Sequence, residues 1–331
     1  MAEWNEGGMR AVWVREFGGP EVLVAGWAPE PVPGAGQVVV RVSHANITFV
    51  ETQFRASGRG PFAVEPPFVP GNGVAGTVVG VGEGVDRAVL GRSVVTATGG
   101  SGGYAELALA PADGLYGIPD GLAPEAALAL LADGRTAAML VETAGVRPGD
   151  RVLVEAAGGG VGSLLVQLAG AAGAEVTAAA GSATKLQLAR ELGAHATVDY
   201  TEPGWAERVG PVDVVFDGVG GEIGRAAFGR LGAGGRMVSF GLASGSWADI
   251  DAEEAAAREV TLLGLRPTPD RVRAATEHVL AEAVAGRLRP VIGRRFPLER
   301  AADAHRAIES RATLGKTLLD VAQPGPDGHV R

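Results

Sequence analysis

The stretch RVLVEAAGGGVG, at residues 151–162, decides how the rest of the chain is interpreted. Its first six residues predict a buried strand ending at Ala156, and an apolar helix is expected from Val161 to Ala172. Glycines in the turn between them let backbone N–H groups approach a pyrophosphate, and the start of the helix adds partial positive charge. Ala156, Gly159 and Gly162 have the spacing of a dinucleotide fingerprint in its required strand, turn and helix context. The stretch therefore predicts a dinucleotide-binding unit.

Strands and helices alternate on both sides of this stretch. Further strands are expected at Glu175–Ala180, Thr197–Tyr200, Asp213–Asp217, Arg236–Phe240 and Thr261–Leu265. Further helices are expected at Ala123–Ala144, Lys185–Leu192, Gly224–Leu231 and Arg271–Ala285. Such alternation predicts an α/β fold with a parallel, doubly wound sheet that binds its ligand at the carboxyl ends of its strands.

The chain before Pro119 has a different character. From Arg10 onward, short valine-rich stretches are separated by glycine and proline, which predicts antiparallel strands in a barrel-like lobe. A length of 331 residues also favours two lobes. A strand, helix and strand close the chain at Val321, and their periodicity does not say which lobe they join. Residues 1–8 and 322–331 are expected to be flexible ends.

Composition excludes several classes of partner and site. A formal net charge of −9 disfavours nucleic acid and anionic membranes as partners. The absence of cysteine excludes disulfides and thiolate metal sites. No apolar run reaches the ~20 residues that a membrane span needs, and the acidic start is unlike a secretory signal, so a cytoplasmic protein is expected.

The stretch after the second strand predicts which dinucleotide is bound. Enzymes that use NAD usually hold the ribose 2′-hydroxyl with an acidic residue about 20 residues beyond the glycine turn, but residues 178–182 contain no carboxylate. Ser182, Lys185 and Tyr200 offer two hydroxyls and a cation to a 2′-phosphate, so NADPH is the expected cofactor. The alternative is that Lys185 is simply a solvated residue in the first turn of a helix.

A series of ordered motifs resembles one family over the length from Met9 to Val321. The chain is similar to the zinc-free quinone oxidoreductases, the zeta-crystallin-like branch of the medium-chain dehydrogenase/reductase superfamily. The motifs are Phe17–Pro20, Ala45–Arg55, Val69–Gly76, Gly103–Glu106, Asp133–Ala137, Ala156–Gly162, Val198–Tyr200, Asp217–Gly221 and Ala304–Lys316. Each motif is loose by itself, and their common order is specific.

The resemblance implies a GroES-like catalytic domain of residues 9–121 with 267–321 and a Rossmann NADPH-binding domain of residues 122–266. It places Thr136 near the carboxamide of the cofactor, residues 240–242 against the nicotinamide ribose, and Arg311 near the cofactor. The expected cofactor-binding residues are Thr136, Gly159, Gly160, Val161, Gly162, Ser182, Lys185, Tyr200, Val219, Phe240, Gly241, Leu242 and Arg311. A homodimer is also implied, and the apolar edge stretch Thr261–Leu265 favours it.

The same resemblance bears on the reaction. The family's metal-binding relatives carry zinc ligands at positions that fall on Thr48, Phe49 and residues 71–73 here, and none of these can replace them, so no metal is expected. Thr48 and Glu51 are the expected catalytic residues near the nicotinamide; the alternative for Glu51 is a structural salt bridge to Arg55. Without a Lewis acid, hydride transfer from NADPH to a quinone or another conjugated carbonyl compound is expected.

Two other functions stay open at this point. The chain can be an enoyl or alkenal double-bond reductase, which the motifs do not separate from a quinone reductase. It can also be a non-catalytic NADPH-binding protein, because no acid or base is recognisable. Tyr104 is the obvious candidate, but its strand context favours a packing role. The five histidines are likewise expected to be surface or packing residues, since no two have ligand spacing.

Overall fold

The computed structural model describes residues 8–321, which form two compact units. Unit 1 comprises residues 8–132 and 292–321, and unit 2 comprises residues 133–291. The expected domain boundaries differ from this division, because residues 122–132 belong to unit 1 and residues 267–291 to unit 2. As boundaries of functional domains, the expected ones stay a prediction.

The expected flexible ends lie outside the described residues, except for Gly8. This residue begins a strand and pairs with Pro29, so its assignment to a flexible end was wrong.

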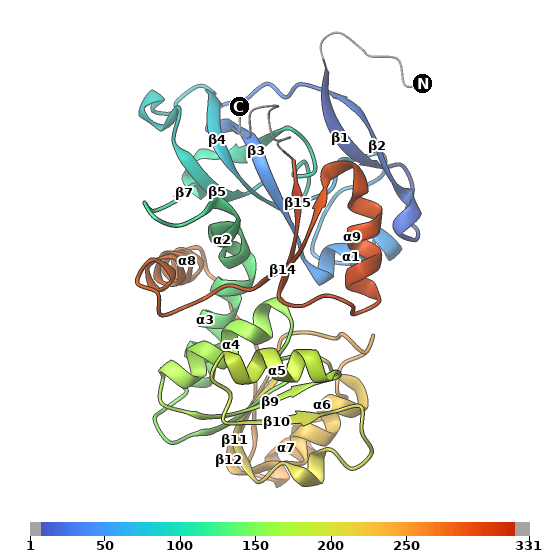
Figure 1. Cartoon of the computed structure of the whole chain (residues 1–331), viewed down its shortest axis with the longest axis vertical. Coiled ribbons are helices and arrows are strands. Elements are labelled where there is room, and N and C mark those ends of the chain that lie inside the picture. Colours follow the sequence, from blue (N-terminus) through green and yellow to red (C-terminus); the bar gives the residue numbers. More distant parts are fainter. Residues whose placement is uncertain (1–7, 322–331) are drawn as a thin grey trace. The chain divides into compact units, whose positions relative to one another are not determined.

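Unit 2 is built around a six-stranded sheet in the order β10-β9-β8-β11-β12-β13, with every ladder parallel. The strands are β8 (Arg151–Val154), β9 (Glu175–Ala180), β10 (Ala196–Asp199), β11 (Val212–Asp217), β12 (Leu231–Ser239) and β13 (Thr261–Leu263). The helices are α3 (Arg135–Ala144), α4 (Gly160–Ala171), α5 (Ala183–Glu191), α6 (Gly221–Phe228), α7 (Ala252–Ala257) and α8 (Pro269–Val284). Figure 1 shows α4 and α5 along one face of this sheet. The doubly wound sheet is thus confirmed.

The strand order of unit 2 locates its ligand site. Chain order runs outward from β8 through β9 to β10 and then returns to β11 on the other side of β8. The loops that leave β8 and β11 therefore run in opposite directions. The place where the strand order reverses is the switch point of the sheet, and sheets of this kind bind their ligands in the crevice there. Val152, Leu153 and Val154 are fully buried, as expected for a strand covered on both faces.

Residues 123–144 do not form the single helix that their composition predicts. Helix α2 (Pro124–Ala129) ends in the π-helical turn η4 (Leu130–Gly134), and α3 begins at Arg135. A π-helical turn is wider than an α-helical one and is often found at functional sites. Here it carries Asp133, whose position is described below.

Unit 1 is dominated by antiparallel strands, as expected. Its main sheet has the order β14-β15-β3-β4-β5-β7, with β6 paired to β3, and β1 and β2 form a separate pair. The strands are β1 (Gly8–Val14), β2 (Leu23–Pro29), β3 (Gln37–Ile47), β4 (Gly73–Val81), β5 (Ser93–Ala97), β6 (Leu107–Pro111), β7 (Tyr116–Gly117), β14 (Ile292–Pro297) and β15 (Lys316–Asp320). Two further helices are α1 (Phe49–Ser57), which was not predicted, and α9 (Ala301–Glu309).

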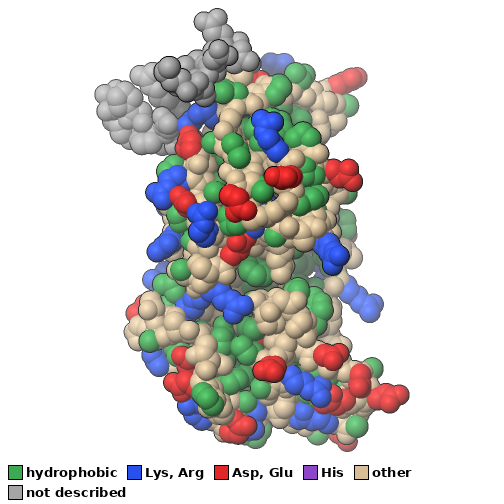
Figure 2. Space-filling view, turned by 90° about the vertical axis from the view of Figure 1, so that its right-hand side faces the viewer, with side chains coloured by type: hydrophobic (Ala, Val, Ile, Leu, Met, Phe, Trp, Pro, Cys, Tyr) green, Lys and Arg blue, Asp and Glu red, His purple; other side chains and the backbone are tan. Residues whose placement is uncertain are grey.

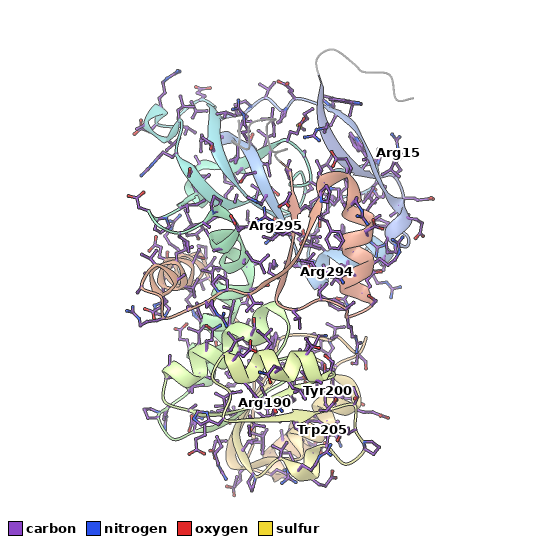
Figure 3. The ribbon with its side chains drawn as sticks, viewed as in Figure 1. Arg15, Arg190, Tyr200, Trp205, Arg294 and Arg295 are labelled. Atoms are coloured by element: carbon purple, nitrogen blue, oxygen red, sulfur yellow. The ribbon has the colours of Figure 1, made fainter. Side chains whose placement is uncertain are left out.

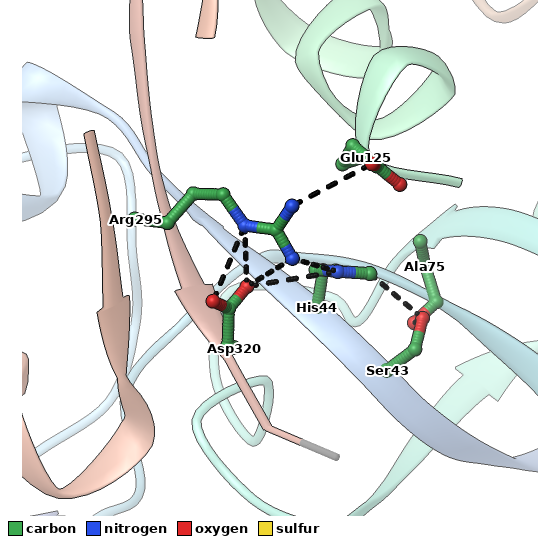
Figure 4. A network of polar contacts seen from close by, with 6 residues as sticks. All are labelled: Ser43, His44, Ala75, Glu125, Arg295 and Asp320. Carbon is green, nitrogen blue, oxygen red and sulfur yellow. Dashed lines mark hydrogen bonds and ion pairs between the residues drawn. The ribbon is translucent and has the colours of Figure 1, made fainter. Parts of the chain in front are cut away.

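The C-terminal strands complete the sheet of unit 1, because β15 pairs antiparallel with β3. A polar network reinforces this junction (Figure 4). Arg295 of β14 donates to Nε2 of His44 in β3 at 3.1 Å and forms an ion pair with Asp320 of β15. An arginine only donates, so Nε2 is an acceptor and His44 is neutral; its Nδ1–H then faces Ser43 Oγ at 3.0 Å. Burial, aided by Arg295, lowers the pKa of His44.

The surface and the helices bear on the partners that the protein can have. On the face drawn in Figure 2, acidic, basic and hydrophobic side chains are intermixed, so this face offers no extended basic area for a polyanion. Within residues 8–321, no helix combines the length and apolarity that crossing a membrane requires.

Candidate functional site

In the glycine turn of unit 2, the backbone leaves no room for a side chain at Gly162. Ala156 has a φ of +48°, and Gly159 donates its N–H to the Ala156 carbonyl at 2.8 Å. A Cβ at Gly162 would lie 2.2 Å from that carbonyl oxygen, so a larger residue would push α4 away from the turn. The absence of a side chain at Gly162 therefore lets the start of α4, with Gly160 and Val161, lie directly against the turn, where a helix N-terminus can bind a phosphate.

The π-helical turn brings Asp133 to the beginning of the same helix. A Cβ at Gly160 would lie 1.9 Å from Asp133 Oδ2, so this carboxylate occupies the space beside the helix N-terminus. Asp133 is 8% exposed. Thr136, expected to contact the cofactor, is the second residue of α3 and half-buried, so it follows Asp133 by one helical turn.

Lys185 packs directly over the glycine turn. A Cβ at Gly158 would lie 2.6 Å from both Cβ and Cγ of Lys185. Ser182 is the N-cap of α5, and its hydroxyl oxygen accepts the N–H of Lys185 at 3.4 Å. The structure thus brings Ser182 and Lys185 together with the turn, as the NADPH prediction requires.

Tyr200 completes this corner from the next strand. It follows β10, donates its N–H to Ala180 at 3.3 Å, and places its ring 6.5 Å from that of Trp205, measured between centroids (Figure 3). A Cβ at Gly181 would lie 2.9 Å from Cε2 of Tyr200. The carboxyl ends of β9 and β10 therefore carry the three residues that were expected to hold a 2′-phosphate.

The loops after β11 and β12 form one packed surface that contains Val219, Phe240, Gly241 and Leu242. A Cβ at Gly218 would lie 2.7 Å from Cζ of Phe240, and one at Gly241 would lie 2.7 Å from the Gly218 carbonyl oxygen. Phe240 donates its N–H to the Asp217 carbonyl at 2.9 Å. Val219 and the segment 240–242, which are separate in the sequence, therefore meet at the carboxyl ends of neighbouring strands.

In unit 1, Thr48 and Glu51 form the N-terminal cap of α1. Glu51 Oε2 accepts the N–H of Thr48 at 2.7 Å and the hydroxyl of Thr48 at 2.6 Å, and Glu51 Oε1 accepts the N–H of Asn72 at 2.8 Å. Glu51 is 6% exposed, and burial raises its pKa, opposed by these bonds and by the charge of Lys316. The two residues predicted to act together are thus in direct contact.

The alternative partner proposed for Glu51 was wrong. Arg55 forms its ion pair with Glu309 of α9, and its guanidinium also donates to the carbonyls of Gly18 and Thr52. Arg311 follows α9 with a φ of +56° and is exposed. Its expected proximity to the cofactor stays a prediction.

Tyr104 is a packing residue with one polar contact. Its hydroxyl lies 2.9 Å from Nε2 of His305, and both side chains are fully buried. Burial raises the pKa of Tyr104 well above its ordinary value and lowers the pKa of His305 to about 3. His305 is therefore neutral, and its Nε2 accepts a hydrogen bond from the Tyr104 hydroxyl. Neither side chain is exposed to act on a substrate.

Other buried polar residues were missed by the sequence analysis. Glu155 and Asp217 are fully buried side by side in unit 2, and Lys316 is buried beside Glu51 in unit 1. A carboxylate within an otherwise apolar strand was a usable signal for Glu155, whereas nothing local marks Asp133 or Lys316. In residues 8–321, no group of three or more histidine, cysteine or acidic side chains could hold a metal ion.

Comparisons with known proteins agree over nearly the whole chain. The family model described as an alcohol dehydrogenase GroES-like domain matches residues 34–120, and the one described as a zinc-binding dehydrogenase matches residues 192–319. The quinone oxidoreductase of Rattus norvegicus is 33% identical over 325 residues, which cover 94% of this chain and 97% of the relative. The 2-haloacrylate reductase of a Burkholderia species is 34% identical, with 93% and 98% covered.

A mycobacterial protein solved in complex with NADPH has a closely similar structure. It is 33% identical, covers 95% of this chain with 100% of its own, and superposes with a TM-score of 0.86.

Proposed function

Because the chain belongs to the quinone oxidoreductase family of the medium-chain dehydrogenase/reductase superfamily, we propose that it transfers a hydride from NADPH to a quinone or another electron-poor conjugated carbonyl compound. The observation that carries this proposal is the placement of Lys185 over Gly158, next to Ser182 and near the strand end that precedes Tyr200. A cation at this corner favours a phosphate on the ribose, and no carboxylate in residues 178–182 opposes it.

The residues of unit 2 fit NADPH. The turn at 158–160 and the start of α4 would hold the pyrophosphate, and Gly162 lets α4 pack closely against this turn. Ser182, Lys185 and Tyr200 would hold the 2′-phosphate, and the loops with Val219 and Phe240 would line the nicotinamide side. Bound there, NADPH supplies the hydride. The mycobacterial relative solved with NADPH supports this cofactor.

We assign Thr48 and Glu51 a positioning role for the acceptor. The Thr48 hydroxyl is fixed by Glu51 Oε2, so its oxygen has a defined direction and can accept or pass a hydrogen bond. By the family resemblance, Thr48 and Phe49 occupy the positions of zinc ligands in the metal-binding members of the superfamily, and neither side chain could replace them. A conjugated acceptor suits such a site, since the charge that develops on it is delocalised and needs no Lewis acid.

A second candidate function is the reduction of an activated carbon–carbon double bond. The relative named 2-haloacrylate reductase favours it, because its similarity to this chain is as extensive as that of the named quinone oxidoreductases. Both reactions deliver a hydride to a conjugated system, so the same cofactor site serves either.

A comparison of acceptors tests these proposals. NADPH absorbance is followed with a benzoquinone, an enone and a 2-haloacrylate as acceptors, and the quinone is expected to be reduced fastest. Faster turnover of the enone or haloacrylate would assign the second function. Cofactor binding without oxidation in any of the three reactions would favour the non-catalytic NADPH-binding protein.

We further propose that the protein is a cytoplasmic homodimer. Strand β13 is the edge of the unit 2 sheet, and Leu262 in its middle is 41% exposed. An apolar edge strand with free pairing positions is suited to a second copy of the same chain.

A further inference from the structure

The ends of β8 and β11 place two carboxyl groups next to each other inside unit 2. The parallel ladder pairs Phe216 with Val154, so the next positions along it are Asp217 and Glu155. The Glu155 N–H bonds to the Phe216 carbonyl at 3.0 Å and keeps this register beyond the strand. Both carboxyl groups are fully buried at the switch point of the sheet, directly before the glycine turn and the β11–α6 loop.

The hydrogen-bond donors around Glu155 and Asp217 are too few to stabilise two ionised carboxylates. Asp217 Oδ1 accepts the N–H groups of Val219 at 3.1 Å and Gly220 at 2.7 Å, and Asp217 Oδ2 accepts the Ser239 hydroxyl at 2.9 Å. Glu155 Oε2 shares the Val219 N–H at 3.2 Å. Among the described residues, Glu155 Oε1 has no hydrogen-bond partner, and the Gly218 N–H and the adjacent Asp217 carboxyl group also act on the Glu155 carboxyl group.

The donor set therefore assigns the charge to Asp217 and the proton to Glu155. Two buried carboxylates in contact cannot both ionise at a tolerable cost, and the one with fewer donors keeps its proton. Burial, followed by the charge and hydrogen bond of Asp217, raises the pKa of Glu155 well above its ordinary value. Two other ionisable residues contact the adjacent glycine turn, Lys185 over Gly158 and Asp133 beside Gly160.

We propose that Glu155 and Asp217 share one proton and act as a positioning pair that fixes the β11–α6 loop for NADPH. Three bonds from the pair end on the N–H groups of Val219 and Gly220, which are thereby turned inward. The carbonyl groups of Val219 and Gly220 are also bonded, to the N–H groups of Ser244 at 2.8 Å and Gly224 at 3.0 Å, so the loop is held in one conformation. The backbone of Gly220 is closely packed as well. Its φ is +70°, and a Cβ at this position would lie 2.1 Å from the Ser246 carbonyl oxygen.

This inference rests on the proposed function, and its consequence is a dependence of NADPH affinity on the neutral form of Glu155. When the shared proton is lost, both carboxylates are negatively charged. They then compete for the Val219 N–H and repel each other. The loop held by Asp217, packed under Phe240, is the part of unit 2 that would move.

The test compares a neutral isostere with an apolar residue. Glu155→Gln keeps an oxygen for Val219 and gives an N–H to Asp217, and its dissociation constant for NADPH at pH 7 is expected within about threefold of wild type. Glu155→Leu offers Asp217 no donor and is expected to weaken NADPH by about tenfold. Glu175→Gln, an exposed acid in the same unit, is the matched control.

Two further measurements separate this pair from a purely structural one. The infrared carbonyl band of a protonated carboxylic acid is expected in wild type at pH 7 and absent in Glu155→Gln. From pH 6 to 10 the ratio of the wild-type to the Glu155→Gln dissociation constant is expected to rise. Lys185 and Tyr200 are the same in both proteins, so their contributions cancel in the ratio.

Absence of the infrared band, or equal NADPH affinity in Glu155→Leu and wild type with the fold intact by circular dichroism, would overturn the proposal. Failure of wild type to bind either NADPH or NADH would instead refute the proposed function, and the infrared band would still decide whether the proton is shared.

Discussion

Lys185 lies against the backbone of Gly158, so that a Cβ on this glycine would be 2.6 Å from the lysine side chain. The contact joins the first turn of α5 to the turn between β8 and α4, which are the two segments expected to hold the phosphates of one dinucleotide. Lys185 is therefore placed between the turn that is expected to hold the pyrophosphate and the end of β9, where the 2′-phosphate is expected.

Replacement of Lys185 tests cofactor choice. Lys185→Ala removes a charge-assisted bond worth about 1.5–3 kcal/mol, and we expect NADPH to bind roughly tenfold more weakly. NADH affinity should stay nearly unchanged, and Lys185→Arg should retain most of the preference. Fluorescence titration with both cofactors measures this, and an equal loss for both would show that Lys185 does not contact the 2′-phosphate.

Gly181→Asp probes the same corner through repulsion. A carboxylate there should weaken NADPH and favour NADH, because it repels the phosphate and accepts from ribose hydroxyls. Its Cβ would also lie 2.9 Å from Tyr200 and 3.0 Å from Thr201, so both side chains must shift. Gly181→Asn causes the same crowding without charge. Identical cofactor preferences in the two variants would mean that crowding, rather than charge, decides the outcome.

Glu51 should matter both for stability and for turnover. Glu51→Ala leaves the partly buried donors of Thr48 and Asn72 without an acceptor, and we expect a loss of about 2 kcal/mol in the free energy of unfolding. Glu51→Gln keeps one acceptor and should lose less stability, while kcat falls in both variants. Urea unfolding and steady-state kinetics measure the two effects, with the exposed Glu16→Gln as control. Unchanged kcat in Glu51→Gln would limit Glu51 to capping α1.

The buried His305 makes stability depend on pH in the acid range. Its pKa is about 3 in the fold against 6.5 for an exposed histidine, so the unfolded chain binds a proton that the native protein does not. The stability that His305 contributes is complete above pH 6.5 and falls by roughly 1.4 kcal/mol per pH unit toward pH 3.

His305→Gln, which can still accept from Tyr104, should be less sensitive to acid. We expect its free energy of unfolding to lose about 3 kcal/mol less than that of wild type between pH 7 and pH 4. The exposed His278→Gln should follow wild type. Parallel curves for wild type and His305→Gln would show that His305 is not the group that titrates.

A charge on the edge strand should separate the proposed dimer. Leu262→Lys places a cation in the centre of β13, and light scattering at micromolar concentration should then give the monomer mass. Val284→Lys alters another exposed apolar residue, on α8, and should remain dimeric. A wild-type monomer would remove the basis for the proposal.

The fold class followed from local signals. The glycine turn at 156–162, strand and helix periodicity, and the valine-rich first part predicted a doubly wound sheet and an antiparallel lobe, and both are confirmed. These features are readable because each depends on residues close together in the chain. Helix α1 was missed although Thr48 and Glu51 have the spacing of a capping box, which is itself a local signal for the start of a helix.

The sequence by itself determined the family, through the order of its motifs. It also determined the parallel sheet and the position of Lys185 near the glycine turn, because both depend on the spacing of strands, turns and helices that are close together in the chain. Only the tertiary structure decided that Asp133 lies against Gly160, that Arg55 pairs with Glu309 instead of Glu51, and that Glu155 faces Asp217. Each of these contacts joins segments that are separate in the chain, and strand register and helix packing bring them together. Burial then changes the pKa of such groups, and a carboxyl group has no buried environment until the chain has folded.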